Sequence, residues 1–237
     1  MDFFFSAELW VALLTLSLLE IVLGVDNLVF VSISVARLPE HLRSRARRFG
    51  LALACVTRIL LLLSLALLAR MSDPLFTLYG TDFSVRDLIL IGGGLFLLTK
   101  STLEIHQSLE TAGDEELEAR KPIPFSWVIM QIAIIDIVFS LDSVITAVGM
   151  VNNIPIMVAA IVIAVLGMIF AADPIGEFIE RNPTVKMLAL AFLLLVGMAL
   201  VADGLDFYIP RSYLYFAMAF SAGVEGLNLT VKHRQRK

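Results

Sequence analysis

The chain has 237 residues, of which 59% are hydrophobic, and a formal net charge of −4. An ordinary soluble domain is about 45–50% apolar, and the excess here falls in blocks of about 20 residues, the length that crosses a bilayer core as a helix. These blocks exclude an ordinary water-soluble domain. Cys55 is the single cysteine, which excludes an intrachain disulfide and a cysteine-based metal cluster.

The apolar blocks predict an all-α membrane protein with seven transmembrane helices in a single transmembrane domain. No basic residue precedes the first block, and the block is too long for a signal peptide, so we expect it to stay as the first span. Breakers such as Pro39, Pro74, Pro155 and Pro210 mark several of the connections. The predicted spans are about 9–36, 49–69, 87–103, 126–150, 154–172, 184–203 and 213–230.

The longest connection, about 104–125, is acidic, with Asp114, Glu115, Glu116 and Glu118. We expect it to be a solvated cytoplasmic loop. Basic residues gather in the connections after the first, third and fifth spans and in the C-terminal tail, whereas the other side carries only Arg70, Arg86 and Arg211. Because basic connections face the cytoplasm, we predict an outside N-terminus and a cytoplasmic C-terminus.

A short pattern of acids occurs twice in the chain. The segment from Glu20 to Asp26 and Asn27 reappears as Asp136 to Asp142 and Ser143, with an acid at both matching positions and a small polar residue after the second acid. If each repeat holds three spans, the second copy enters the membrane from the opposite face. The sequence therefore predicts two inverted three-helix repeats, at about 9–103 and 126–203, and one C-terminal helix at about 213–230, an arrangement common in transporters.

The repeated acids lie in the middle of predicted spans, where a charge costs roughly 2.5–3.5 kcal/mol on insertion scales. Such acids usually face a bundle interior and serve function. Positions seven apart share a helix face, so Glu20 lies on the face of Asn27. Local unwinding at Gly24 and Ser140 would turn all four acids inward and free backbone carbonyls. The alternative is that the acids are paired or protonated and only hold the bundle together.

The side chains that could bind a cation inside these spans are mostly oxygen donors, because all three histidines fall in connections or the tail. Such donors suit Mn²⁺, Mg²⁺ or Ca²⁺ better than Zn²⁺ or Cu⁺. Arg58, inside the second span, requires an acid partner, with Glu20 and Asp136 as candidates, and would balance the charge of the site. The predicted cation-binding residues are Glu20, Asp26, Asn27, Asp136, Asp142 and Ser143.

Three segments of the chain resemble the TerC family of membrane proteins. They are 19–27, 135–143 and 215–221 with Glu225. The chain is most similar to the bacterial inner-membrane branch of this family. The resemblance implies a fold related to the LysE-type transporters and a link to tellurite resistance, Mn²⁺ efflux and metal supply for exported enzymes. It also implies that the two acidic motifs form the cation site.

We therefore expect a divalent-cation transporter, with Mn²⁺ efflux across the inner membrane as the first hypothesis. The alternative is a non-transporting scaffold in tellurite or envelope-stress resistance, with the acids as internal salt bridges. An intramembrane aspartyl protease is disfavoured because no GxGD motif occurs, so we expect no enzyme activity, no catalytic residue and no bound cofactor. The expected partners are the lipid bilayer and the cation, with no nucleic acid, and assembly is left open between a homo-oligomer and a membrane complex.

Overall fold

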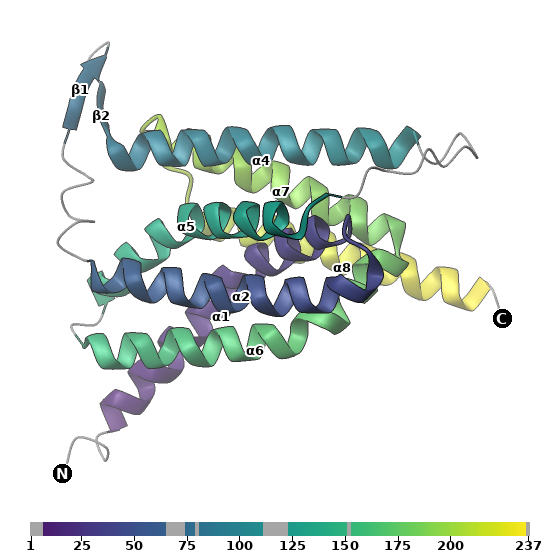
Figure 1. Ribbon diagram of the computed structural model, residues 1–237, viewed down its shortest axis with the longest axis horizontal. Helices are drawn as coiled ribbons and strands as arrows, with labels where there is room; N and C mark the ends of the chain where they lie inside the picture. Colours follow the sequence, from purple (N-terminus) through teal and green to yellow (C-terminus); the bar gives the residue numbers. More distant parts are fainter. Residues whose placement is uncertain (1–6, 65–73, 79–80, 111–122, 151–152, 236–237) are drawn as a thin grey trace. The chain divides into compact units, whose positions relative to one another are not determined.

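The computed structural model describes residues 7–64, 74–78, 81–110, 123–150 and 153–235. Helices make up most of this part of the chain, with one two-stranded hairpin (Figure 1). The elements are α1 (Ala7–Val35), α2 (Glu40–Leu63), β1 (Pro74–Leu78), β2 (Thr81–Ser84), α4 (Val85–Glu110), α5 (Phe125–Met150), α6 (Ile154–Arg181), α7 (Pro183–Gly204) and α8 (Arg211–Gln235).

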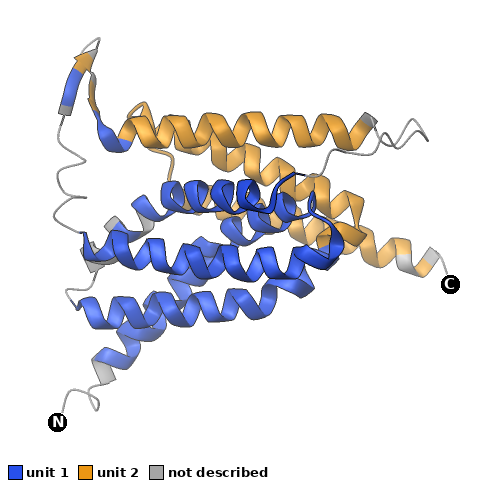
Figure 2. Ribbon diagram, viewed as in Figure 1, with its two compact units in different colours: residues 1–76, 84–86, 121–178 blue, residues 77–83, 87–120, 179–237 orange. Residues whose placement is uncertain are grey.

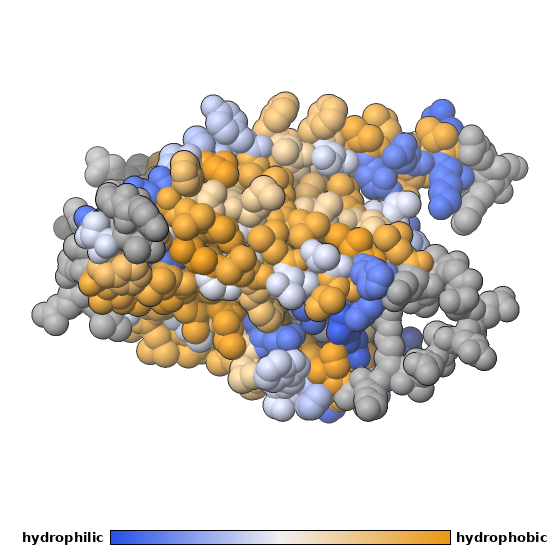
Figure 3. Space-filling model, turned by 90° about the horizontal axis from the view of Figure 1, so that it is seen from above, coloured by the Kyte–Doolittle hydropathy of each residue, from blue (hydrophilic) through white to orange (hydrophobic). Residues whose placement is uncertain are grey.

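Five of the described helices are long and apolar enough to cross a membrane, namely α1, α4, α6, α7 and α8. In addition, α5 contains a shorter apolar segment, Phe125–Leu141. Large hydrophobic side chains lie on the outside of the protein, among them Trp10, Phe170 and Phe216, and most of the described surface visible in Figure 3 is hydrophobic. An exposed apolar surface of this extent requires lipid around it. The predicted all-α membrane protein is therefore confirmed at this level.

Helix α2 begins earlier than the sequence analysis predicts, at Glu40 rather than at about 49. The added turns contain the arginines that were assigned to a connection. Arginine is a good helix former, and Pro39 lies just before the first turn, where a missing N–H costs nothing. A cluster of arginines therefore does not exclude a segment from the start of this helix.

Helix α6 also continues past its predicted end at 172, through Pro174, to Arg181. Asp173 is held there by three side chains of α2: Ser44 Oγ donates to it at 2.8 Å, Arg48 Nη2 at 2.8 Å and Arg47 Nη1 at 3.3 Å. A Cβ at Gly176 would lie 2.5 Å from Cζ of Arg47. The last turns of α6 thus form a docking surface for the basic start of α2.

The hairpin of β1 and β2 was not predicted, because this segment was assigned to a connection. Thr77 Oγ1 donates a hydrogen bond to Asp82 Oδ1 across it. Helix α4 likewise runs on to Glu110, into the segment predicted as an acidic loop. The acidic residues Asp114, Glu115, Glu116 and Glu118 lie outside the described residues.

The chain divides into two compact units, coloured separately in Figure 2. The first contains α1, α2, α5 and nearly all of α6, and the second contains most of α4 together with α7 and α8. Each unit therefore takes helices from both of the predicted repeats. In the first unit, α5 packs against α1 and α2, and α1 against α2.

In the second unit, α4 and α7 approach closely at a pair of glycines. A Cβ at Gly94 would lie 2.6 Å from the carbonyl oxygen of Gly197, and a Cβ at Gly197 would lie 3.0 Å from the carbonyl oxygen of Gly94. Small residues at helix interfaces in membranes allow backbones to pack directly. This contact explains the glycine at each position.

We expect Gly94→Ala to destabilise the protein by roughly 1–3 kcal/mol, the usual cost of overpacking. The measurement is the apparent Tm in detergent, followed by size-exclusion chromatography after heating. Gly92→Ala is the matched control, because a Cβ at Gly92 meets nothing within 4 Å. Equal Tm values for the two variants would contradict the close approach.

Candidate functional site

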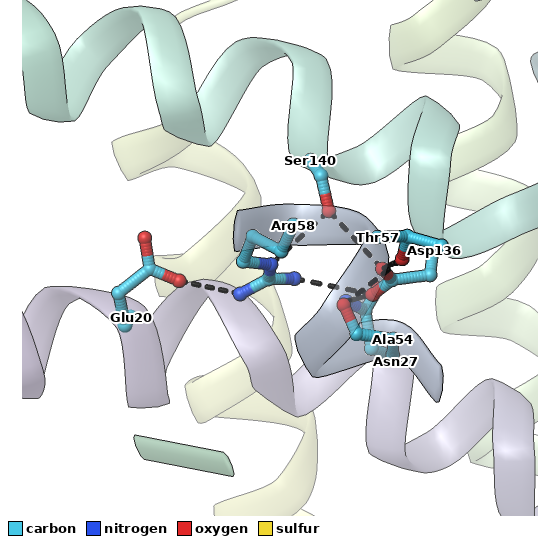
Figure 4. A network of polar contacts seen from close by, with 7 residues as sticks. All are labelled: Glu20, Asn27, Ala54, Thr57, Arg58, Asp136 and Ser140. Atoms are coloured by element: carbon cyan, nitrogen blue, oxygen red, sulfur yellow. Dashed lines mark hydrogen bonds and ion pairs between the residues drawn. The ribbon is translucent and has the colours of Figure 1, made fainter. Parts of the chain in front are cut away.

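A cluster of buried polar side chains lies where α1, α2 and α5 pack together in the first unit (Figure 4). Helix α1 supplies Glu20 and Asn27 from one face, because positions seven apart fall near the same stripe. Helix α2 supplies Arg58, and α5 supplies Asp136 and Ser140 one turn apart. All five side chains are buried, with Glu20 and Arg58 each 2% exposed.

Arg58 lies between two carboxylates. Its guanidinium forms an ion pair with Glu20 Oε2 through Nη1, and Nη2 lies 3.3 Å from Asp136 Oδ1. Figure 4 shows Glu20 and Asp136 on opposite sides of this group. Nε donates a hydrogen bond of 3.1 Å to Ser140 Oγ. All three guanidinium nitrogens are therefore engaged, which fixes the plane of the group.

Both carboxylate oxygens of Asp136 are already occupied. Oδ1 accepts a hydrogen bond from Asn27 Nδ2 at 3.0 Å and one from Arg58. Oδ2 accepts from Thr57 Oγ1 at 3.1 Å and from Ser140 Oγ at 3.3 Å. Each of its two oxygens therefore accepts two hydrogen bonds. Asp136 is consequently the most firmly held acid of the cluster.

Glu20 is held less fully than Asp136. Its Oε1 points away from Arg58 in Figure 4. Glu20 also lines a small cavity, with space of about 10 Å³ for the centre of a water molecule, whose other walls are apolar. A volume of this size is about that needed for one water. The walls of the cavity are Leu16, Leu62, Val144, Met157, Ala160 and Ile161.

Asn27 has one donor in use and one acceptor left over. Its Nδ2 binds Asp136, while its Oδ1 is buried and has no hydrogen-bond partner among the described residues. A buried polar atom without a partner requires an explanation. A carbonyl oxygen beside a carboxylate is an oxygen donor of the kind that hard cations accept.

The structure brings together four of the predicted residues, Glu20, Asn27, Asp136 and Arg58. Arg58 contacts both of the acids predicted as its partners. Asp26 is buried too, at 7% exposure, but follows Glu20 by six positions and so lies on a different face of α1. The side chains of Asp142 and Ser143 lie outside the part that the structure describes, so their roles stay predictions.

The predicted unwinding at Gly24 and Ser140 is wrong, because α1 and α5 are helical through both positions. Ser140 instead uses its hydroxyl to bind Asp136 and Arg58. Gly24 makes room for a neighbouring helix, since a Cβ there would lie 2.5 Å from Sδ of Met168. Close packing therefore accounts for this glycine.

Two donors in the cluster, Thr57 and Ser140, were missed as site residues by sequence reasoning. Each had a local signal: Thr57 directly precedes the buried Arg58, and Ser140 follows Asp136 by one helical turn, at the spacing that allows contact. In the described part of the chain, no three His, Cys, Asp or Glu side chains gather in a metal-binding geometry. Between Glu20 and Asp136, the cation present is the guanidinium of Arg58.

Long apolar helices with exposed hydrophobic side chains, and a buried charged cluster among α1, α2 and α5, define an integral membrane protein. The family model described as "Integral membrane protein TerC family" matches residues 5–237. The chain therefore belongs to the TerC family, as its acidic motifs indicated.

Similar curated proteins include three from Haemophilus influenzae and Escherichia coli. A "UPF0053 protein" of Haemophilus influenzae is 53% identical over 225 residues, covering 95% of each chain. The "UPF0053 inner membrane protein YgdQ" of Escherichia coli K12 is 54% identical over 220 residues, covering 93% of this chain and 92% of YgdQ. The "UPF0053 inner membrane protein YoaE" of the same strain is 47% identical, but this chain covers only 44% of it. No solved structure matches the chain.

We expect Arg58→Met to destabilise the protein by about 3–5 kcal/mol, because it leaves two buried carboxylates without their positive partner. The measurement is the Tm in detergent. Arg45→Gln is the control, since Arg45 is an exposed arginine on the same helix. Adding Glu20→Gln and Asp136→Asn to Arg58→Met removes the buried charges and should recover part of the loss. An unchanged Tm in Arg58→Met would contradict the role of the ion pairs.

Proposed function

We propose that this protein transports divalent cations, with Mn²⁺ as the substrate and efflux as the direction. The observation that carries the proposal is the buried cluster of Glu20, Asn27 and Asp136, with Asn27 Oδ1 left without a donor among the described side chains. Charged groups inside membrane helices usually mark substrate and ion pathways. Carboxylate and amide oxygens are the ligands that Mn²⁺ prefers.

Arg58 has a specific part in this proposal. It holds Glu20 and Asp136 while no metal ion is bound, so that neither carboxylate is buried without a counter-charge. A divalent cation that binds Glu20 and Asn27 displaces Arg58 from its ion pair with Glu20. Asp136 keeps the guanidinium close, because it is fixed by three further donors. The ion and the arginine then compete for the same carboxylate.

The proposed ion site also takes in Asp142 and Ser143 of the second motif, and Asp26, which lies about 120° around α1 from Glu20. Alternating access comes from rocking of one three-helix repeat against the other, with the site near the midplane. Gly94 and Gly197 occupy similar places in the two repeats, which supports the assignment of the repeats. The transported ion is the only ligand proposed, with no cofactor and no catalytic residue.

The proposed location is the bacterial inner membrane, which the name of the relative YgdQ states for that protein. The N-terminus lies outside and the C-terminus in the cytoplasm. This orientation places Arg45 and Arg48 of α2, and Lys232 and Arg234 of α8, on the cytoplasmic side, in agreement with the distribution of basic residues.

A second function is favoured by one observation. Asp136 has four donors on its two oxygens, and Arg58 has no nitrogen left over. Such a saturated network also suits a non-transporting scaffold in tellurite or envelope-stress resistance, in which the acids hold α1, α2 and α5 together. The scaffold predicts that neutralising the acids lowers stability and leaves cellular metal unchanged.

We expect Mn²⁺ flux into proteoliposomes to fall at least about tenfold in Glu20→Gln, Asp26→Asn and Asp142→Asn, because each removes a charge that offsets ion dehydration. Ser32→Ala is the matched control: Ser32 is buried on α1, and its hydroxyl binds the carbonyl of Leu28 in its own helix. Unchanged flux in Asp26→Asn and Asp142→Asn would contradict the assignment of the site.

Whole-cell manganese content separates transport from the scaffold. Cells that lack the protein should accumulate Mn²⁺ in excess, and Glu20→Gln should fail to restore the normal content even where its abundance in membranes equals that of the wild type. A normal Mn²⁺ content in the deletion strain, together with a lower Tm for Glu20→Gln, would favour the scaffold.

The orientation is tested with reporter fusions. A fluorescent reporter that folds only in the cytoplasm should be active after residue 237, and a phosphatase that is active only outside should be active when inserted after residue 207. The reverse pattern would contradict the proposed topology.

A further inference from the structure

Three buried oxygen atoms of α1 have no hydrogen-bond partner in the described part of the chain. They are Ser17 Oγ, Asn27 Oδ1 and Ser34 Oγ. Their residues are 8%, 4% and 1% exposed. Buried polar atoms are nearly always satisfied in proteins, by protein groups or by ordered water. Three exceptions on a single helix therefore point to something that these oxygens bind.

The three residues share a stripe with Glu20. At 100° per residue, Ser17, Glu20, Asn27 and Ser34 fall within about 100° of the circumference of α1. At 1.5 Å per residue, the stripe extends about 25 Å along the axis, most of the roughly 30 Å of a hydrocarbon core. Oxygen atoms thus occur at intervals along one side of α1 over a length close to the thickness of a hydrocarbon core.

A neighbouring serine shows that this is not a general property of serines in α1. Ser32 is as buried as Ser34, at 1% exposure, yet its hydroxyl donates to the carbonyl of Leu28 at 2.8 Å. A serine inside a helix can satisfy its hydroxyl in this way, by bonding to the carbonyl four residues earlier. Ser17 and Ser34 do not, so their hydroxyl oxygens remain available.

The order of the groups along the stripe is also informative. Single neutral oxygens lie toward both ends, at Ser17 and Ser34, while the carboxylate of Glu20 and the amide of Asn27 lie between them. Conduction requires binding that is strong enough to admit an ion and weak enough to release it. Neutral hydroxyls on either side of a charged centre meet this requirement for a hydrated divalent cation.

We infer that the cation travels along this face of α1, with Ser17 and Ser34 as oxygen steps on either side of the Glu20 and Asn27 centre. The inference rests on the proposed function, which it deepens by naming a route beyond the acidic motifs. Ser17 serves the outside portion of the route and Ser34 the cytoplasmic portion.

Cysteine labelling tests the route without measuring transport. Cys55→Ala removes the single cysteine of the chain, and Ser17→Cys, Ser34→Cys and Ser32→Cys are then introduced one at a time. Membranes carrying each variant are treated with a cationic methanethiosulfonate reagent, with and without MnCl₂. Ser17→Cys and Ser34→Cys should react about tenfold faster than Ser32→Cys, because thiol modification follows access to water, and Mn²⁺ should slow both.

Flux measurements distinguish failure of this inference from failure of the proposed function. Ser17→Ala and Ser34→Ala should lower Mn²⁺ flux in proteoliposomes several-fold, while Ser32→Ala should not. If the wild type transports Mn²⁺ but the cysteines at 17 and 34 are as unreactive as that at 32, or react without protection by Mn²⁺, the route is overturned and the transporter stands. If the wild type carries no divalent cation, the proposed function fails and the inference fails with it.

Discussion

The structure of the first unit depends on one buried guanidinium. Transfer of the Arg58, Glu20 and Asp136 side chains from water into the protein costs several kcal/mol for each ion. This cost is offset only when the three charged groups lie within ion-pair distance of one another. That geometry requires α1, α2 and α5 to meet at one depth in the bundle, since each contributes one of the three charges. The hydroxyls of Thr57 and Ser140 and the amide of Asn27 then donate hydrogen bonds to the carboxylate oxygens of Asp136. The triad therefore fixes the register of the three helices, as well as their proximity.

The two acids of the triad Arg58, Glu20 and Asp136 differ in how many hydrogen bonds they accept, and this difference links structure to function. Asp136 is surrounded by donors, whereas Glu20 has Arg58 on one side and an apolar cavity near it. Asn27 takes part in both environments. Its amide nitrogen donates a hydrogen bond to Asp136, whereas its amide oxygen is buried without a partner among the described residues. A purely structural network gains from complete pairing. An acid that exchanges its partner has to be held more loosely, and Glu20 is the acid in that position.

Much of this arrangement could be predicted from the sequence, because charge in an apolar block is costly and so is rarely accidental. The seven-residue spacing placed Glu20 and Asn27 on one face, and the need of Arg58 for an acid named both of its partners. Periodicity gives the face of a helix but not the distance to its neighbour, so the hydrogen bonds of Thr57 and Ser140 could not be foreseen. Gly24 and Ser140 were misjudged for a related reason: a small residue permits unwinding and close packing equally, and the contact of Gly24 with Met168 is visible only in three dimensions. The arginines before residue 49 predict a solvent-exposed connection, whereas they lie in the first turns of α2 and Arg47 is buried against α6.

Each of the two units is built from helices that are far apart in the sequence, and this affects the order in which the units can form during synthesis. Helices enter the membrane in the order of synthesis, yet α1 and α2 complete their unit only with α5 and α6, and α4 completes its own only with α7 and α8. Half-way through translation, neither unit exists. Arg58 and Glu20 belong to the first two helices, so their ion pair requires no residue that is synthesised after α2. The pair can therefore form before Asp136 of α5 is made, which would lower the cost of inserting the guanidinium into lipid.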